Sequence, residues 1–445
     1  MHREPRVAVV GAGPAGLAAL RALTAAGIDA VAFERGARVG GVWTLEDRAT
    51  AAYSSLHLIT SRGRTEYAEH PMPPGTPDYP SRTAVGLWLE GYVERFGLGE
   101  RIRLGTAVER AERRPGGGWE LEAGRERVEA DVLVVASGHN EIAGWPDPPY
   151  PGEFGGDQLH ALDYDDARAL AGKRVLVVGM GNSAMDIATE LSHHAARTCL
   201  SVRHGSWIIP KRMLGKPADQ VIKPWAAVHV PWRLRQPVAQ TLLRMTVGRP
   251  EDVGLPAPGG GLFQSHPTIS DTIVSRIAHG LIAPKPGIES LDPSGVRFAD
   301  GSREDFDAIV WCTGYRVRIP FLDDALTGPD PQTLRLYKRV LHLDVPDLFF
   351  IGLMQSTGSA FPILERQSQL LAGHLTGTWA PPRPALMRLD CERRYRRALR
   401  RWGPHGRPAM RVDFDRYMHE LGVELERGRR RAARANGAGR AAVAT

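Results

Sequence analysis

Two glycine-rich turns constrain the fold of this chain more than any other feature of its sequence. The first, GAGPAG at residues 11–16, follows the short apolar run at residues 6–10 and precedes a helical pattern. Gly11 permits a tight turn, Gly13 lets the backbone approach a pyrophosphate, and Gly16 allows the helix to pack closely on the strand. The helix N-terminus attracts the phosphate charge. The pattern therefore predicts a strand–helix–strand unit that binds a dinucleotide.

The second turn, GMGNSA at residues 179–184, lies between an apolar run at residues 174–178 and a further helical pattern. Its third glycine is replaced by Ala184, which still packs but loosens the turn slightly. The turn begins 168 residues after the first. Two copies of one supersecondary unit predict an α/β protein with two Rossmann-like dinucleotide-binding domains.

The residues that end the second strand of each unit carry opposite charges. Glu34 follows the apolar run at residues 30–33, where a carboxylate accepts hydrogen bonds from ribose hydroxyls and repels a 2′-phosphate. Arg203 stands at the equivalent place in the second unit, where a guanidinium suits the 2′-phosphate of NADP. The first site therefore suits FAD or NAD and the second NADP, so we expect an electron carrier and a hydride donor on one chain.

The positive charge of the chain is concentrated at its C-terminal end. The 445 residues carry a net charge of +7, but residues 381–445 hold 17 Arg against 7 Asp and Glu, a net +10, which leaves −3 for the rest. A body of that charge does not support a nucleic-acid-binding core. We expect the C-terminal segment to be a solvated helix and tail, with weak binding to a membrane surface or a partner as the alternative.

Cysteine spacing and hydropathy exclude several other classes. Cys199, Cys312 and Cys391 lie far apart with no CxxC pair, which argues against a disulfide scaffold, a zinc ribbon or a dithiol reductase. No metal site is expected, because no cluster of suitable ligands is apparent. No apolar run approaches the ~20 residues that cross a bilayer, so we expect no integral membrane segment. A reducing cytoplasm fits these features.

Four further motifs accompany the two turns. FGGDQLHALDY at residues 154–164 matches an FxGxxxHxxx(Y/F) fingerprint, and GGVW at residues 40–43 matches a GGxW segment. VVASG at residues 134–138 and WCTGY at residues 311–315 have the form of strand-to-turn crossovers. Together these motifs resemble the flavin-containing monooxygenase family, whose members use FAD and NADPH on one chain. The resemblance covers residues 6–427.

The resemblance implies an NADPH domain inserted into the FAD domain. It also implies a cycle in which NADPH reduces FAD, O2 adds at flavin C4a, and nitrogen or sulfur of a small molecule takes one oxygen. The expected partners are that substrate and O2, with no nucleic acid; a homodimer is allowed. The expected parts are residues 1–165 (FAD-binding, first part), 166–285 (NADPH-binding, with an irregular substrate-side insertion), 286–426 (FAD-binding, second part, with C-terminal helices) and 427–445 (a disordered Arg-rich tail).

The residues expected to bind FAD or NADPH lie in or beside these turns and motifs. They are Gly11, Gly13, Ala15, Gly16, Glu34, Gly41, Val42, Trp43, Ser61, Val108, Gly138, Gly179, Gly181, Asn182, Ser183, Arg203, His160, Thr313 and Gly314. We expect His160 either to fix the hinge between the two cofactor domains or to touch NADP.

One segment departs from the family pattern. In SLHLITSR, residues 55–62, Ile59 stands where many members carry an Asn beside the flavin–nicotinamide contact. We expect either His57 or Thr60 to replace that amide by hydrogen bonding, and the imidazole of His57 is also a candidate proton donor to a peroxide. The alternative for His57 is a partly buried side chain beneath a Pro-rich loop. His57, Ile59 and Thr60 are therefore the candidate catalytic residues.

Other functions stay open at this stage. The second hypothesis is Baeyer–Villiger oxidation of ketones by the same cofactor cycle, because some relatives with a substitution like Ile59 accept ketones. Tyr164 disfavours it, since the fingerprint of that group usually ends in Trp. Hydroxylation of amino-acid amines, an NADPH-dependent flavin reductase or oxidase, a quinone reductase and an inactive flavin-binding scaffold are the remaining alternatives.

Overall fold

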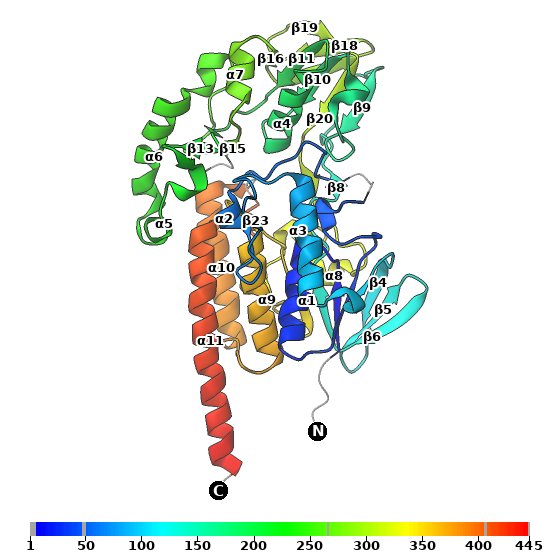
Figure 1. The fold of residues 1–445 in the computed structure, drawn as a ribbon, viewed down its shortest axis with the longest axis vertical. Helices are drawn as coiled ribbons and strands as arrows, with labels where there is room; N and C mark the ends of the chain where they lie inside the picture. The colour runs from blue at the N-terminus through cyan, green and yellow to red at the C-terminus, as the bar shows by residue number, and fades with distance from the viewer. Residues whose placement is uncertain (1–5, 47–49, 265–266, 405–406, 444–445) are drawn as a thin grey trace.

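Two five-stranded sheets form the frame of the protein, one for each glycine-rich turn (Figure 1). The structure, a computed structural model, describes residues 6–46, 50–264, 267–404 and 407–443, with side chains as far as residue 435. The strand orders are β22-β7-β1-β2-β3 and β16-β11-β10-β20-β9, and every pair is parallel. The predicted α/β class with two Rossmann-like domains is confirmed.

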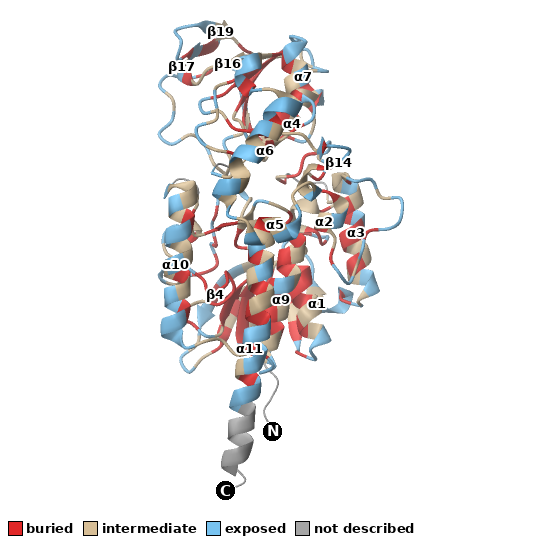
Figure 2. Ribbon diagram, turned by 90° about the vertical axis from the view of Figure 1, so that its left-hand side faces the viewer, coloured by how far each residue is buried: buried red, intermediate tan, exposed pale blue. Residues whose placement is uncertain are grey.

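The strands of both sheets are short, and the central ones are apolar. The first sheet consists of β1 (Val7–Val10), β2 (Ala30–Phe33), β3 (Ile102–Arg103), β7 (Val132–Val135) and β22 (Leu348–Phe350). The second consists of β9 (Asp157–His160), β10 (Arg174–Val178), β11 (Arg197–Ser201), β16 (Ile282–Lys285) and β20 (Ala308–Trp311). All residues of β1, β7, β20 and β22 are buried, as expected for parallel strands with helices on both faces (Figure 2).

Each glycine-rich turn leads directly into a helix. α1 (Pro14–Ala25) follows β1, and α4 (Asn182–Leu191) follows β10. α1 packs against α9 (Phe361–Leu375), and α4 packs against α7 (Ile273–Ala278). α3 (Arg82–Arg95) adds Val85, Trp88 and Leu89 to the core that α1 and α9 share. These helices fix the first residues of α1 and α4 at the carboxyl ends of the two sheets.

The duplication extends beyond the turns. An antiparallel sheet of β4 (Val108–Arg113), β5 (Trp119–Ala123) and β6 (Glu126–Ala130) precedes β7. A second one, of β17 (Ile288–Asp292), β18 (Gly295–Phe298) and β19 (Arg303–Asp305), precedes β20. Each meander is therefore an insertion before the strand that returns to its parent sheet.

This topology corrects the predicted boundaries at residues 165 and 285. β9 pairs with β20, and β20 pairs with β10, so the second domain extends from β9 to β20, residues 157–311. The sequence motifs could not show this, because a buried strand carries no local signal of the sheet it joins. The second domain is still an insertion, since the chain enters it after β7 and leaves it after β20.

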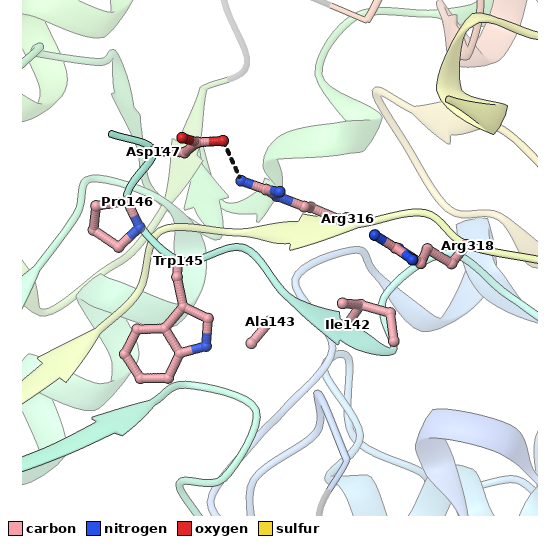
Figure 3. A pocket seen from close by; sticks show the side chains of 7 residues that line it. All are labelled: Ile142, Ala143, Trp145, Pro146, Asp147, Arg316 and Arg318. Carbon is pink, nitrogen blue, oxygen red and sulfur yellow. Dashed lines mark hydrogen bonds and ion pairs between the residues drawn. The ribbon is translucent and has the colours of Figure 1, made fainter. Parts of the chain in front are cut away.

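The two crossings between the domains lie side by side (Figure 3). β8 (Ile142–Ala143) and β21 (Tyr315–Arg316) pair antiparallel, and Gly144 N–H donates to Gly314 O at 2.8 Å. Arg316 donates to Asp147 at 3.0 Å beside a cavity that Trp145 also lines. The crossings therefore form one two-stranded hinge.

Residues 206–265 differ from the predicted irregular insertion. They contain α5 (Pro224–His229) and the 16-residue α6 (Trp232–Val247), which carries Pro237 inside it. The helix was missed because its apolar residues do not gather on one buried face. Leu243 is buried, whereas Leu234 and Val238 are 66% and 70% exposed.

The C-terminal part also differs from the prediction, because the expected disordered tail 427–445 is helical as far as Val443. α10 (Pro384–Trp402) is followed by α11 (Phe414–Val443), which extends below the body in Figure 1. Contacts beyond residue 426 hold the helix: Arg431 Nε donates to Ala380 O at 2.9 Å, and Ala432 is buried. Residues 444–445 lie outside the described part. Within the described residues, no helix is both long and apolar enough to cross a membrane.

Candidate active site

A cavity of about 760 Å³ is bounded by both glycine-rich turns. Gly11 and Gly13 line it from the first turn, and Asn182 and Ser183, the first residues of α4, line it from the second. Each turn stands at the carboxyl end of its own sheet, which is where nucleotides bind in open α/β folds. One cavity thus joins the two edges at which cofactors would bind.

The first turn leaves its backbone open to a ligand. Gly11 has φ +104°, a conformation that residues with a side chain rarely adopt. A Cβ on Gly16 would lie 1.8 Å from Gly11 O, so the helix can pack this closely only with glycine there. A Cβ on Gly13 would lie 3.2 Å from the Cα of Gly41, which also lines the cavity.

Glu34 closes the same end of the cavity. Its side chain is buried, accepting from Ala12 N–H at 2.8 Å through Oε2 and from Gly36 N–H at 2.9 Å through Oε1. The carboxylate is therefore fixed at the end of β2 and lines the cavity. A bare glycine backbone beside a fixed carboxylate fits the pyrophosphate and ribose of FAD.

The second turn has the matching geometry for a phosphorylated cofactor. Gly179 has φ +139°, and a Cβ there would lie 2.5 Å from Cys312 O. Gly181 caps α4, whose N-terminus supplies free backbone N–H groups. Arg203 is exposed two residues beyond β11. An exposed guanidinium at this place fits the 2′-phosphate of NADPH.

The structure brings most of the predicted site residues together. Those that line the cavity are Gly11, Gly13, Ala15, Glu34, Gly41, Val42, Trp43, His57, Ile59, Thr60, Val108, Gly138, Asn182 and Ser183. Gly16 lies inside the first turn, and Gly179, Gly181 and Arg203 belong to the second. Ser61 is buried at the start of α2 (Arg62–Thr65), where its N–H donates to Asp219. His160, Thr313 and Gly314 lie at the hinge.

His160 has the geometry of a hinge residue. It is fully buried, and its Nδ1 accepts from Leu162 N–H at 3.1 Å. Its ring centroid is 5.7 Å from that of Trp145 and 5.6 Å from that of Tyr315. Burial lowers the pKa of the imidazole, which favours the neutral ring. These contacts favour the hinge role over contact with NADP.

The three candidate catalytic residues line the wall between the two turns. Ile59 presents an apolar side chain to the cavity. Thr60 Oγ1 is paired with Thr65 Oγ1 at 2.9 Å, and His57 Nδ1 lies 3.0 Å from Ser55 O. His57 is exposed, so the alternative of a partly buried imidazole is wrong.

Sequence reasoning missed several side chains of this wall. Asp219 lines the cavity, and its Oδ1 is buried with no hydrogen-bond partner among the described residues. His139 also lines it, and burial lowers the pKa of that imidazole to about 4, so the ring is neutral. The segment 354–361 before α9 completes the wall. The sequence could have indicated this segment, because it lies between the end of the buried strand β22 and the start of α9, where ligands bind in such folds.

A hydrogen bond between the domains was also missed. Tyr53 OH donates to Asp186 Oδ2 at 2.7 Å. Burial raises the pKa of that carboxyl. Ser55 Oγ donates to Glu190 at 2.7 Å from the same segment. The segment that carries the candidate catalytic residues is therefore fastened to α4.

Comparison with known proteins agrees with this geometry. Residues 4–428 match the family described as flavin-binding monooxygenase-like. Dimethylaniline monooxygenase (N-oxide-forming) 2 from Rattus norvegicus is 31% identical, over 94% of this chain and 82% of the rat protein. S-allyl-L-cysteine S-oxygenase from Allium sativum has a similar fold, with a TM-score of 0.71 and 22% identity over 95% of this chain and 89% of that one.

A cyclohexanone monooxygenase structure also shares the fold, with a TM-score of 0.73 and 17% identity over 96% of this chain and 99% of that one. The match along nearly the whole chain, together with a cavity that joins two dinucleotide turns, shows that the protein belongs to the flavin-binding monooxygenase-like family.

Proposed function

We infer that this protein is an FAD- and NADPH-dependent monooxygenase that transfers one atom of O2 to nitrogen or sulfur of a small molecule. The observation that carries this conclusion is the single cavity bounded by both glycine-rich turns. A hydride can pass from one cofactor to the other only if the two sites meet. Family membership and the N-oxide-forming relative support the same reaction class.

The residues of this chain would bind, orient and shield the cofactors. Gly13 and Glu34 would hold FAD, and Gly181 and Arg203 would hold NADPH. When bound, these groups supply the electron transfer and the activation of oxygen. Ile59 adds an apolar surface to the wall between them, which excludes water from the reacting atoms.

Asp219 favours a substrate with a positively charged amine. Its unpaired Oδ1 faces no donor among the described residues, while Oδ2 accepts from Ser61 N–H at 2.7 Å. A buried carboxylate oxygen without a partner is costly, and the N–H of a protonated amine would supply the missing donor. The ammonium group would then transfer its proton to the Asp219 carboxylate, which frees the nitrogen lone pair to take the oxygen. We therefore propose that the cavity prefers amines over neutral sulfides.

The proposed reaction is tested with ¹⁸O2 and three probes: a tertiary amine, a neutral sulfide and a cyclic ketone. We expect one NADPH and one O2 to be consumed for each amine oxide or sulfoxide formed, with one ¹⁸O in the product and the other atom in water. Hydrogen peroxide in equal amount to NADPH with every probe would show an oxidase instead. A lactone as the dominant product would favour the Baeyer–Villiger alternative.

Substitution of Asp219 tests the substrate preference. Asp219→Asn retains an oxygen that accepts from Ser61 N–H but removes the charge. We expect KM for the amine to rise by about tenfold, because one charge-assisted contact is lost, with KM for the sulfide unchanged. Equal changes for both substrates would contradict a charge-selective role.

Two further expectations stay predictions. The reducing cytoplasmic setting is supported by Cys199, Cys312 and Cys391, which form no disulfide. The allowed homodimer can be checked by size-exclusion chromatography with light scattering, which distinguishes a 48.7 kDa monomer from twice that mass.

A further inference from the structure

A second cavity, of about 210 Å³, lies between α6, α10, α11 and β24 (Arg411–Val412). Within the described chain it shares no lining residue with the active-site cavity. Eight of its fifteen lining residues are arginines, and only Asp413 and Glu420 are acidic. We call it the arginine cavity. Six of its arginines belong to residues 381–445, so part of the positive charge of that segment is gathered around this cavity.

The two carboxylates are already shared among four arginines. Arg401 pairs with Asp413 at 3.0 Å. Arg416 and Arg397 lie 3.3 and 3.7 Å from Glu420, and Arg394 also pairs with it. Of the remaining four, Arg339 donates to the backbone oxygens of Met410 and Arg411. No carboxylate in the described ranges lies within 4 Å of Arg233, Arg339, Arg400 or Arg411. The cavity therefore keeps a surplus of positive charge.

Arg411 is the residue that most requires a ligand. It is only 5% exposed and lines the cavity, and its Nε and Nη2 have no hydrogen-bond partner among the described residues. Its Cζ lies 5.1 Å from the ring centroid of Trp402, a contact that satisfies no N–H group. Burial and the nearby Arg401 lower the pKa of the guanidinium to about 10, which leaves it charged at neutral pH. A buried charge without acceptors is strongly unfavourable.

We propose that the arginine cavity binds a phosphate-class oxyanion, either inorganic phosphate or the phosphate of a small monoester, with Arg411 as its buried partner. Arginine N–H groups match two oxygens of a phosphate at once. At ~30 Å³ per water, the cavity holds roughly seven waters, enough for a phosphate with a short organic group.

The arginine cavity is connected to the active site through one pair of strands. β24 pairs in parallel with β23 (Gln355–Ser356), whose two residues line the active-site cavity. Gln355 N–H donates to Met410 O at 3.1 Å, and Thr357 N–H donates to Val412 O at 3.0 Å. An anion held by Arg411 would therefore fix the strand that supports this wall.

Calorimetric titration of the NADP⁺-saturated holoenzyme tests the proposal. NADP⁺ occupies the cofactor's own phosphate site, and chloride keeps the ionic strength constant. We expect inorganic phosphate to bind with one site per chain, and Arg411→Gln to bind at least about tenfold more weakly. Tighter binding of glycerol phosphate than of phosphate would identify a monoester ligand; equal or weaker binding would identify free phosphate. Because the readout is heat, this result is independent of the oxygenation reaction.

Two controls distinguish binding in the arginine cavity from a general effect of surface charge and from loss of folding. Arg400→Gln alters an exposed arginine at the rim and should weaken binding by about tenfold, whereas Arg393→Gln, exposed on the same helix but outside the cavity, should leave it unchanged. In phosphate-free buffer, Arg411→Gln should melt no lower than the parent protein, because it removes an unpaired buried charge. A lower melting temperature of Arg411→Gln in phosphate-free buffer would overturn the proposal. So would a titration in which the parent protein releases no heat of phosphate binding, or one in which Arg411→Gln binds phosphate as tightly as the parent.

Discussion

At the scale of single residues, the active site depends on places where a side chain cannot be accommodated. Gly11, Gly13 and Gly16 were predicted from spacing alone, because the chemistry of a dinucleotide turn is local in sequence. Asp219 and Tyr53 were not predicted, since their partners Ser61 and Asp186 are 158 and 133 residues away. Spacing thus predicts the residues of the glycine turns and of the strand that follows, but not those that long-range folding brings to the cavity.

Gly16→Ala tests the close packing of α1 against the first glycine-rich turn. The new Cβ would lie 1.8 Å from Gly11 O, so the turn must open and move α1 away from β1. We expect the purified variant to retain about tenfold less FAD, measured by flavin absorbance relative to protein. Gly99→Ala, where a Cβ meets nothing within 4 Å, is the matched control and should retain the parent's FAD content. Full FAD content in Gly16→Ala would contradict the close packing.

Arg203→Gln tests the predicted selectivity for NADPH. The exposed guanidinium has no role in NADH binding, since that cofactor lacks the 2′-phosphate. We expect KM for NADPH to rise by about tenfold, with KM for NADH and kcat at saturating NADPH unchanged. Steady-state rates with both cofactors provide the measurement. A rise in KM for NADH of the same size would place Arg203 in general binding rather than in phosphate recognition.

At the scale of secondary-structure elements, prediction succeeded where burial is uniform and failed where few residues are buried or where burial depends on a distant partner. β1 and β10 have continuous apolar runs and were predicted to within a residue. α6 was missed because only Leu243 of its 16 residues is buried. The end of α11 was predicted as disordered from its arginines and glycines, yet it is held by Trp379 and Ala380 from the loop between α9 and α10.

Two glycines of α11 provide a matched test of that packing. A Cβ on Gly428 would lie 1.8 Å from Trp379 Nε1, whereas a Cβ on Gly422 meets nothing within 4 Å. Gly422→Ala should stabilise the protein by about 0.5–1 kcal/mol, the usual gain in a helix interior. Gly428→Ala should destabilise it by about 1–3 kcal/mol through overpacking. Urea denaturation measures both, and a stabilising Gly428→Ala would show that this end of α11 does not pack on Trp379.

At the scale of the whole molecule, the arrangement of the two domains decides whether the cofactors meet. The paired strands β8 and β21 connect the second domain to the first. The segment before His57 adds hydrogen bonds between the two domains. Tyr53 and Ser55 donate from this segment to Asp186 and Glu190 of α4 at 2.7 Å each. The candidate catalytic residues therefore lie on a segment that carries contacts between the domains.

The Tyr53–Asp186 contact predicts a stability difference that depends on pH. Burial raises the pKa of Asp186 above the usual value, while the Tyr53 hydroxyl opposes that rise. For a carboxyl with a raised folded-state pKa, the stabilising contribution is present at low pH and is lost as pH increases through that pKa. Tyr53→Phe removes the opposing donor, so the pKa of Asp186 rises further and the charged carboxylate loses its partner. The variant's deficit should therefore grow with pH.

We expect Tyr53→Phe to cost about 1–2 kcal/mol at pH 8 and less at pH 5, as measured by urea denaturation at both values. The double variant with Asp186→Asn is the control, because it removes the titrating group and its deficit should not change with pH. An equal deficit for Tyr53→Phe at the two pH values would mean that the hydroxyl contributes only packing. The pH-dependent outcome would identify this charged hydrogen bond as one of the contacts that hold the NADPH domain against the segment of His57 and Ile59.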